Sequence, residues 1–529
     1  MFGQRILSLA LLATSVTAVQ ETVDLGYSRY HGQALDNGIT QWYGMRYAAA
    51  PIGNLRFMPP QDPVYQDGVQ EAQYGGATCL PTEHHSFEAG ASEDCLFINV
   101  QAPSSATEES RLPVMLYIQG GGYSLNSSPN LNAAGLIAAA SYEMMAVSFN
   151  YRVGPYGFMS DGKDIAANLG LKDQIKAMEW VREHAALFGG NPDHIVLVGV
   201  SAGAGCISLH LTAYGGVDNG LFHGAIVESP PFSTMLDVAQ SKYQYTNFAT
   251  RLGCYGEGTL ECLRSKTAEE IQQVNFNIPL PGGAKPPEWQ WLPVIDGDLI
   301  TDYTYRAFDR GNFIRVPAIF GADANDGTKF VPSTLSSLAE SNQWLLNQYP
   351  TLTLDQFADI ASMYPNPNES CPATGCYWRQ ASNVYGEMRF LCPAIFMNTA
   401  MSAHGVMTSY SYMWNVSDPA QMEAGEGVPH IIEVDAWLGP GYSNPPESYK
   451  PGQMNAEASP VIQGYWTSFI RYLDPNPYRR AGSAEWSPWS EDKAWLVFGV
   501  EGRTDMEFIG DELERRCNYW ADNAVALTI

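Results

Sequence analysis

The amino-acid sequence predicts an α/β fold, in which a mostly parallel central sheet carries helices on both faces. First, short apolar segments alternate with stretches of helical periodicity along much of the chain. Second, one apolar segment runs directly into a glycine-rich turn around Ser201 and then into an apolar helical stretch. Third, 45% of the 529 residues are hydrophobic and only 16% are charged, so the chain has enough apolar side chains for a large core.

The N-terminal segment has the features of a secretory signal. Arg5 supplies the positive charge, residues 6–13 form a short apolar run, and Val16-Thr17-Ala18 provides a small-residue cleavage site. We therefore expect residues 1–18 to be a signal peptide and the protein to be secreted, extracellular. Nothing later in the sequence approaches 18 uncharged apolar residues in succession, so we expect no membrane anchor.

Six apolar segments are expected to be strands of the sheet: residues 114–118, 145–150, 195–199, 224–227, 317–321 and 408–414. Between the second and third, residues 169–188 have apolar side chains at helical spacing and end at Gly-Gly-Asn-Pro, which terminates a helix. Stretches at about 234–311 and 332–393 interrupt this alternation. We expect them to be helical or loop insertions over one end of the sheet, so that residues 19–529 form a single domain.

The composition disfavours several classes of partner. The chain has 56 Asp and Glu against 29 Lys and Arg, a formal net charge of -27 at pH 7. Such a polyanion binds poorly to phosphate backbones and anionic lipid, so nucleic acid is not expected as a partner. No cluster of histidine and cysteine has metal-ligand spacing, and we expect neither a metal nor an organic cofactor. The oligomeric state is not readable from the sequence.

The nine cysteines agree with export into an oxidising compartment. Their odd number allows at most four disulfides and leaves one free thiol. We expect the free cysteine to be Cys206, because a small buried thiol packs well on the apolar helix that follows Ser201. Glycosylation sequons begin at Asn368, at Asn415 and, less favourably, at Asn126, where proline follows the sequon.

The segment Gly199-Val200-Ser201-Ala202-Gly203 matches the Gly-x-Ser-x-Gly motif of a nucleophile elbow. An apolar strand precedes it and an apolar helix follows. A sharp turn between the two would hold the serine in strained backbone geometry, which requires neighbours with almost no side chain. It would also place the hydroxyl at a helix N-terminus, where a developing anion is favoured. Ser201 is therefore the candidate nucleophile.

A second glycine-rich segment is the candidate oxyanion hole. The strand at 114–118 runs into Gly120-Gly121-Gly122, and glycines let backbone N–H groups approach a ligand closely. Phosphate binding is a weaker interpretation, because no Gly-Lys-Ser/Thr or Gly-x-Gly-x-x-Gly sequence follows.

The candidate base follows by elimination. In this arrangement the order along the chain is Ser, then Asp or Glu, then His. Beyond residue 320 only His404 and His430 remain, and His430 lies in the loop after the strand at 408–414, where it can reach the carboxyl edge of the sheet. The acid should follow the strand at 317–321, where both Asp323 and Asp326 qualify.

With these residues placed, the chain resembles the type-B carboxylesterase/lipase family of the α/β-hydrolase superfamily, which includes the cholinesterases, and within it the secreted fungal carboxylesterases. The resemblance extends from about Asp24 to Trp520. The motifs that carry it, besides the elbow, are Glu93-Asp94-Cys95-Leu96-Phe97-Ile98-Asn99-Val100, Asn150-Tyr151-Arg152-Val153-Gly154, Asn168-Leu169-Gly170-Leu171-Lys172-Asp173-Gln174 and Phe188-Gly189-Gly190-Asn191-Pro192.

The resemblance implies an α/β-hydrolase catalytic domain and a role for each matching residue. It implies Ser201 as nucleophile, His430 as base and Asp326, rather than Asp323, as the orienting acid. The implied oxyanion donors are the backbone N–H groups of Gly121, Gly122 and Ala202. The family usually has Asp-Glu-Gly where this chain has Asn325-Asp326-Gly327. Because aspartate is one carbon shorter, the imidazole must sit closer or a water must intervene.

The same resemblance implies disulfides between Cys79 and Cys95 and between Cys254 and Cys262. Cys371 and Cys376 are close enough in sequence for a local bridge, which leaves Cys392 to pair with Cys517.

The implied activity is that of a serine carboxylesterase, which hydrolyses small-molecule carboxylic esters through an acyl-enzyme. Only 15 residues separate Cys79 from Cys95 and they are polar, so we expect an open gorge rather than the long amphipathic lid of the similar lipases. A lipase or sterol esterase of the same family is the nearer alternative. A non-catalytic, cholinesterase-like binding protein is a remote one, because such members typically lack the serine.

Candidate pocket residues are Tyr123, Pro230, Pro231, Phe232 and Phe330, although core packing explains the aromatic ones equally well.

Overall fold

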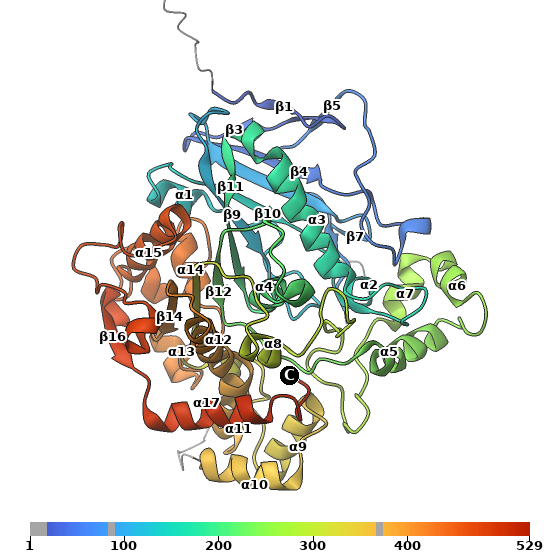
Figure 1. The fold of residues 1–529 in the computed structure, drawn as a ribbon, viewed down its shortest axis with the longest axis vertical. Helices are drawn as coiled ribbons and strands as arrows, with labels where there is room; N and C mark the ends of the chain where they lie inside the picture. The colour runs from blue at the N-terminus through green and yellow to red at the C-terminus, as the bar shows by residue number, and fades with distance from the viewer. Residues whose placement is uncertain (1–17, 83–89, 367–373) are drawn as a thin grey trace, which may run out of the picture.

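A large twisted sheet forms the centre of the protein in the computed structural model, which describes residues 18–82, 90–366 and 374–529. Its 11 strands have the order β16-β15-β14-β13-β12-β11-β9-β10-β8-β4-β3 (Figure 1). The strands from β15 to β10 in this order run parallel, and the strands at both edges are antiparallel. The sheet therefore has the mostly parallel arrangement that the sequence predicts.

The strands of this sheet are β3 (Gln33–Ala34), β4 (Ile39–Arg46), β8 (Phe97–Pro103), β9 (Leu112–Ile118), β10 (Met145–Phe149), β11 (Gly190–Val200), β12 (Gly224–Glu228), β13 (Ala318–Asp323), β14 (Ser409–Trp414), β15 (Ala494–Phe498) and β16 (Thr504–Phe508). All six predicted strands are present. The antiparallel strands β3, β4, β8 and β16 were not among them, and neither was the parallel strand β15. Two small sheets, β1 (Thr22–Asp24) with β2 (Arg29–His31) and β5 (Val69–Glu71), and β6 (Thr78–Cys79) with β7 (Ala91–Ser92), lie outside the main one.

Helices cover both faces of the sheet, because successive side chains of each strand point to opposite sides. On β9, Val114, Leu116 and Ile118 belong to one hydrophobic cluster, together with α3 (Leu169–His184) and α4 (Ala202–Leu211). The intervening Met115 and Tyr117 belong to a second cluster on the other face. The helices of that face are α1 (Ala134–Ala139), α14 (Glu433–Leu438) and α15 (Ala458–Tyr472) (Figure 1).

The two predicted interruptions of the strand pattern contain helices. Residues 234–311 hold α5 (Val238–Arg251), α6 (Thr259–Ser265), α7 (Ala268–Val274) and α8 (Thr304–Asp309). Residues 332–393 hold α9 (Leu338–Gln348), α10 (Leu354–Met363), α11 (Trp378–Gly386) and the start of α12 (Cys392–Ala403). Helices α9 and α10 lie at the end of the molecule opposite β1 and β5 (Figure 1). The remaining helices are α2 (Gly154–Phe158), α13 (Pro419–Glu423), α16 (Trp489–Asp492) and α17 (Asp511–Asn523).

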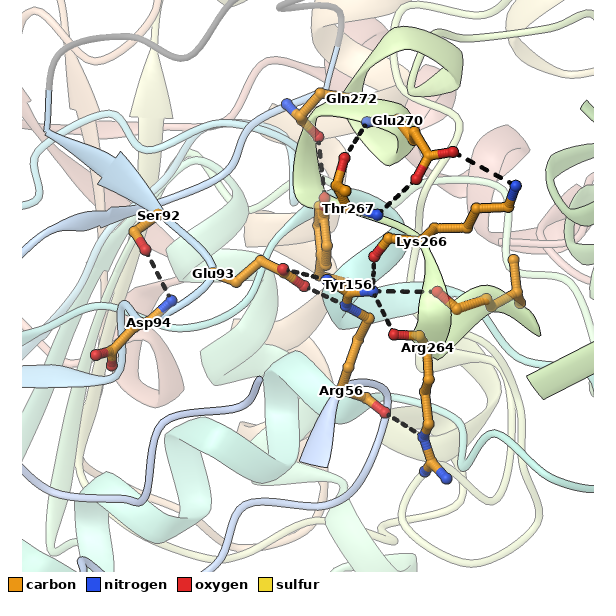
Figure 2. Close-up of polar contacts among 11 residues, drawn as sticks. Arg56, Ser92, Glu93, Asp94, Tyr156, Arg264, Lys266, Thr267, Glu270 and Gln272 are labelled. Atoms are coloured by element: carbon orange, nitrogen blue, oxygen red, sulfur yellow. Dashed lines mark hydrogen bonds and ion pairs between the residues drawn. The ribbon is translucent and has the colours of Figure 1, made fainter. Parts of the chain in front are cut away.

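A buried arginine joins the first insertion to the N-terminal part of the chain. Arg56 forms a two-point ion pair with Glu93, with N···O distances of 2.6 and 2.5 Å (Figure 2). Its third nitrogen donates to the carbonyl oxygens of Leu263, Arg264 and Lys266 at the end of α6. One guanidinium thereby satisfies a carboxylate and several carbonyl groups that the end of a helix leaves unpaired.

The structure contains disulfides between Cys79 and Cys95, Cys254 and Cys262, and Cys392 and Cys517, which are three of the four predicted pairs. Cys376 is also disulfide-bonded, while Cys371, its predicted partner, lies outside the described residues. Cys206 is free and buried, as expected. Within the described chain, no helix is both long and apolar enough to cross a membrane.

The predicted glycosylation sites differ in their surroundings. Asn415 is exposed at the end of β14, whereas the side-chain amide of Asn126 donates to the carbonyl oxygen of Cys79 at 2.6 Å. Asn368 and nearly all of the predicted signal peptide lie outside the described residues. Glycosylation and signal cleavage stay predictions.

Candidate active site

Ser201 occupies the sharp turn between β11 and α4. Its backbone φ is 54° and its ψ is -129°, a conformation that a residue other than glycine rarely adopts. The turn is possible only because its neighbours are small. A Cβ atom added at Gly203 would lie 2.0 Å from the carbonyl oxygen of Ile118, and one added at Gly199 would lie 2.8 Å from the carbonyl carbon of Gly203. Such strain persists where the surrounding structure enforces it, which is common at functional sites.

The three glycines after β9 lie directly against this turn. A Cβ atom added at Gly120 would lie 2.9 Å from the Cβ of Ser201. Gly121 and Gly122 have φ values of 110° and 59°, in the region that favours glycine. The glycine segment is therefore where the predicted oxyanion hole would have to be.

Trp289 covers this segment, since a Cβ atom added at Gly122 would lie 2.2 Å from its indole ring. The sequence contains no signal for this contact, because Trp289 lies in an irregular loop between α7 and α8.

The structure brings His430 and Asp326 together. Asp326 follows β13, His430 lies in the loop after the neighbouring strand β14, and Nδ1 of the imidazole is hydrogen-bonded to Oδ1 of Asp326. The other oxygen of Asp326 accepts hydrogen bonds from the Ser229 hydroxyl at 3.2 Å and from the Asp323 backbone at 3.1 Å. The shorter acid thus reaches the histidine directly, without an intervening water.

The side chain of Asn325 explains how a short acid reaches this histidine. Its Oδ1 accepts a hydrogen bond from the backbone N–H of Val428 at 3.0 Å, and its own backbone N–H donates to the carbonyl of Val428 at 3.0 Å. A Cβ atom added at Gly427 would lie 2.0 Å from Oδ1 of Asn325, so the two loops are in close contact. Asn325 therefore fixes the histidine loop against the loop of the acid.

Nε2 of His430 is buried and has no hydrogen-bond partner among the described residues. The predicted contact between this nitrogen and the Ser201 hydroxyl is therefore not formed as a hydrogen bond here. Catalytic hydrogen bonds are often long or poorly aligned before substrate binds, and tighten only in the complex.

Two aromatic rings pack against the imidazole. The ring centroids of Phe330 and Phe390 lie 4.9 and 4.6 Å from that of His430. Phe330 was predicted as a pocket residue, whereas Phe390 comes from the π-helical turn Glu387–Leu391 before α12 and carries no sequence signal. The other predicted pocket residues are buried. Tyr123 packs edge-on against Phe158, and Phe232 against Tyr305, as ordinary core aromatics do; Pro230 and Pro231 are also buried.

Asp323, the other candidate acid, does not bind the imidazole. Its Oδ2 accepts a hydrogen bond from the backbone N–H of Ile431 at 2.6 Å. It belongs to a group of buried carboxyls with Glu228 and Glu433. Burial is the main cause that raises the pKa of Asp323 and of Glu228 well above the usual range, and the nearby carboxyl of Glu433 adds to both shifts. Burial likewise raises the pKa of Glu433.

The candidate ligand atoms of Asp323, Asp326 and His430 lie within 4.8 Å of one another, close enough for a small cation. Protein hydrogen bonds already engage them: Asp326 binds the imidazole, Ser229 and a backbone N–H, and Asp323 binds the N–H of Ile431. These hydrogen bonds are those of an acid that holds a histidine. The three residues do not form a set of ligands left free for a cation.

His404, the other histidine beyond residue 320, is at the C-terminal end of α12. Its Nε2 is hydrogen-bonded to the backbone carbonyl of Asp309, away from the carboxyl ends of the strands.

Comparison with known proteins decides the family. The model of the carboxylesterase family matches residues 20–520. The chain belongs to this carboxylesterase family. Among its relatives, secreted lipase 4 of Gibberella zeae is 27% identical over 94% of this chain and 92% of its own length. The acylcarnitine hydrolase of Rattus norvegicus is 27% identical over 91% of this chain and 86% of its own.

The crystal structure of Aspergillus niger EstA superposes on this carboxylesterase with a TM-score of 0.93, at 39% sequence identity, over 97% of this chain and 99% of that one. The expected α/β-hydrolase fold and family are thus confirmed, and the protein is a carboxylic ester hydrolase.

Proposed function

We propose that this carboxylesterase is a secreted serine esterase in which Ser201 is the nucleophile, His430 the general base and Asp326 the orienting acid. The observation that carries the proposal is the Asp326–His430 hydrogen bond, made at the edge of the sheet where the strained turn of Ser201 also lies. The residues come from the ends of β11, β13 and β14, and active sites of open α/β sheets lie at the carboxyl ends of their strands.

The reaction would proceed in two halves. In the first, the Ser201 oxygen attacks the ester carbonyl carbon while Nε2 of His430 takes the hydroxyl proton, and the backbone N–H groups of Gly121, Gly122 and Ala202 stabilise the oxyanion. The protonated imidazole, held by Asp326, then gives its proton to the leaving alcohol as the C–O bond breaks. In the second half, water attacks the acyl-enzyme by the same route and releases the acid.

The sharpest test is labelling by a fluorophosphonate probe, which reacts with an activated serine. Wild-type protein should be labelled, and Ser201→Ala should lose both the label and ester turnover while it keeps its unfolding temperature. Ser229→Ala is the matched control, because Ser229 follows the adjacent strand and its hydroxyl donates to Asp326. If Ser201→Ala keeps more than a few per cent of the activity, or if Ser229→Ala alone loses the label, Ser201 is not the nucleophile. An unlabelled wild type would favour a non-catalytic binding role.

Small soluble esters are the proposed substrates. The sequence between Cys79 and Cys95 is short and polar, although part of it lies outside the described residues. A lipase or sterol esterase is the alternative, supported by the similarity to secreted lipase 4. A chain-length series of p-nitrophenyl esters separates them, since an esterase should prefer short acyl chains. A rate jump as the substrate passes its solubility limit would favour the lipase.

A further inference from the structure

Asp323 is hydrogen-bonded both to Asp326 and to the residue that follows His430. Its own N–H donates to Oδ2 of Asp326 at 3.1 Å, and its Oδ2 accepts from the N–H of Ile431, the residue after His430, at 2.6 Å. A single buried residue therefore joins the loop that carries the acid to the loop that carries the histidine.

Ile431 has a backbone conformation that needs such support. Its φ is 59°, and for a β-branched residue a positive φ is a genuine outlier. Residues held in sparsely populated conformations are kept there by contacts that outweigh the strain. The hydrogen bond from the Ile431 N–H to Asp323 is such a contact, and Ile431 directly follows His430 in the chain.

The second oxygen of Asp323 lacks a donor. Oδ1 is buried and accepts no hydrogen bond from any described residue. Oε2 of Glu433 is in the same situation, while Oε1 accepts from the hydroxyl of Tyr412 at 3.1 Å. The two carboxyls are near enough that each affects the pKa of the other. Two ionised carboxylates could only repel, whereas one proton between them would satisfy both oxygens.

We propose that Asp323 and Glu433 share one proton, held on Oδ1 of Asp323 and donated to Oε2 of Glu433, and that Asp323 in this state is a positioning residue for His430. The proposal rests on the proposed function, in which His430 is the base. The pair carries one negative charge instead of two, and it leaves Oδ2 of Asp323 free to hold the Ile431 N–H.

The surroundings favour retention of this proton at neutral pH. The titratable groups that face the pair come from β9, β12, β14, the two active-site loops and the turn before α15. They are carboxyl, phenol or imidazole groups. Their residues are Tyr117, Glu228, Asp326, Tyr412, His430 and Tyr449. Burial, then repulsion by Glu433 and Asp326, raises the pKa of Asp323 well above its usual range. When the proton is finally lost at alkaline pH, two adjacent carboxylates would repel and loosen the hold on Ile431.

The test compares Asp323→Asn with Asp323→Ala. The asparagine oxygen can still accept from Ile431, and its amide donates permanently to Glu433, so this variant imitates the protonated pair. Its kcat at pH 6 should stay within roughly tenfold of wild type, and the alkaline fall of kcat should move upward by at least about one pH unit. Asp323→Ala removes the support of Ile431, and its kcat should fall about 10²-fold with KM nearly unchanged.

Two outcomes would overturn the proposal. In the first, the alkaline fall of kcat occurs at the same pH in Asp323→Asn as in wild type. In the second, Asp323→Asn loses as much kcat as Asp323→Ala at every pH. If Asp323→Asn does not fold, Glu433→Gln serves instead, because its amide donates to Asp323 and removes the same shared proton.

A second measurement needs no catalysis. A shared proton that the native state holds and the unfolded state releases makes stability fall as pH rises above about 4, up to the pKa of the pair. The comparison uses Ser201→Ala alone and Ser201→Ala combined with Asp323→Asn. Between pH 5 and 8, the unfolding temperature of the single variant should fall more steeply than that of the double variant. Equal slopes would refute the shared proton. Failure of the proposed function would show separately, as retained turnover in Ser201→Ala.

Discussion

Asp326 binds the imidazole of His430 directly, although 104 positions separate the two residues in the sequence. The contact depends on Asn325, whose side chain draws the Val428 backbone, and with it the histidine loop, against the loop of the acid. The two loops are thereby held in contact, and the short side chain of Asp326 reaches the imidazole directly. The acid and its neighbour act as one unit.

Replacement of Asp326 tests whether its carboxylate orients His430. Asp326→Asn keeps the shape but offers the imidazole an amide, which no longer stabilises the imidazolium or fixes the correct tautomer. We expect kcat to fall by about 10⁴-fold, with little change in KM. Steady-state kinetics on p-nitrophenyl acetate would measure it. Asp309→Asn, at an exposed aspartate, is the control and should match wild type. A loss of less than tenfold in Asp326→Asn would mean that Asp326 does not orient the base.

The elbow should tolerate no side chain at Gly203. In Gly203→Ala the new Cβ would lie 2.0 Å from the Ile118 carbonyl oxygen, so α4 and β9 must separate. Overpacking of this kind typically costs about 1–3 kcal/mol, and the displaced Ser201 should lose most of its activity. Thermal unfolding and turnover would both report it. Gly441→Ala is the matched control, because a Cβ there meets nothing within 4 Å. Equal stability of the two variants would contradict the close packing.

His210 should make the protein sensitive to acid. Burial lowers the pKa of this histidine to about 3, and its Nε2–H donates to Gln174 at 2.7 Å. The unfolded chain binds a proton at its ordinary pKa near 6.5, so stability is lost as pH falls below that value. Between pH 6.5 and 4.5 the loss should be about 2 kcal/mol, because the slope reaches its full value of about 1.4 kcal/mol per pH unit only well below pH 6.5.

Urea unfolding of wild type and His210→Gln at several pH values would measure this difference. The glutamine does not titrate, so the variant should lose less stability in acid. His404→Gln, at the end of α12, should behave like wild type. An identical acid dependence in all three proteins would show that His210 is not the group responsible.

Two of the sequence motifs meet in a buried ion pair. Arg152 and Asp173 are bonded at 2.7 and 2.8 Å, with side chains 3% and 0% exposed. Asp173→Asn leaves the guanidinium buried without its counter-charge, which should cost about 3–5 kcal/mol in unfolding free energy.

The exposed pair Arg111–Asp193, also 2.8 Å apart, provides the comparison. Asp193→Asn should cost less than about 1 kcal/mol, because exposed ion pairs contribute little. Denaturant unfolding at one pH would measure both substitutions. Similar losses at the two sites would show that burial does not set the strength of the Arg152 pair.

Six of the seven parallel strands, all except β15, and the turn at Ser201 could be predicted because their signals are local. A buried parallel strand is a continuous apolar run, and the elbow needs glycine at fixed positions around the serine. The choice of Asp326 over Asp323 as the acid could not be made from a local signal. Both lie at or just after the end of β13, and only the resemblance to a family separated them before the structure showed which carboxyl reaches the imidazole.

The remaining features depend on contacts between distant segments. Phe390 reaches His430 from a π-helical turn, and Trp289 covers Gly122 from an irregular loop. Neither position has a periodicity or a motif that would single it out. The proximity of Asp323 and Glu433 depends likewise on how the loop after β14 folds back on β13. Such relationships appear only when the chain is assembled in three dimensions.

The state of the cysteines provides a built-in reporter of unfolding. Seven of the eight described cysteines are disulfide-bonded, and the eighth, Cys206, is buried beneath Gln174 with a thiol whose pKa burial raises to about 12. Thiolate is the reactive form, so a maleimide dye should leave this sulfur untouched in the native protein. The rate of dye incorporation would then follow the opening of α4, the helix that begins directly after Ser201, without any engineered label.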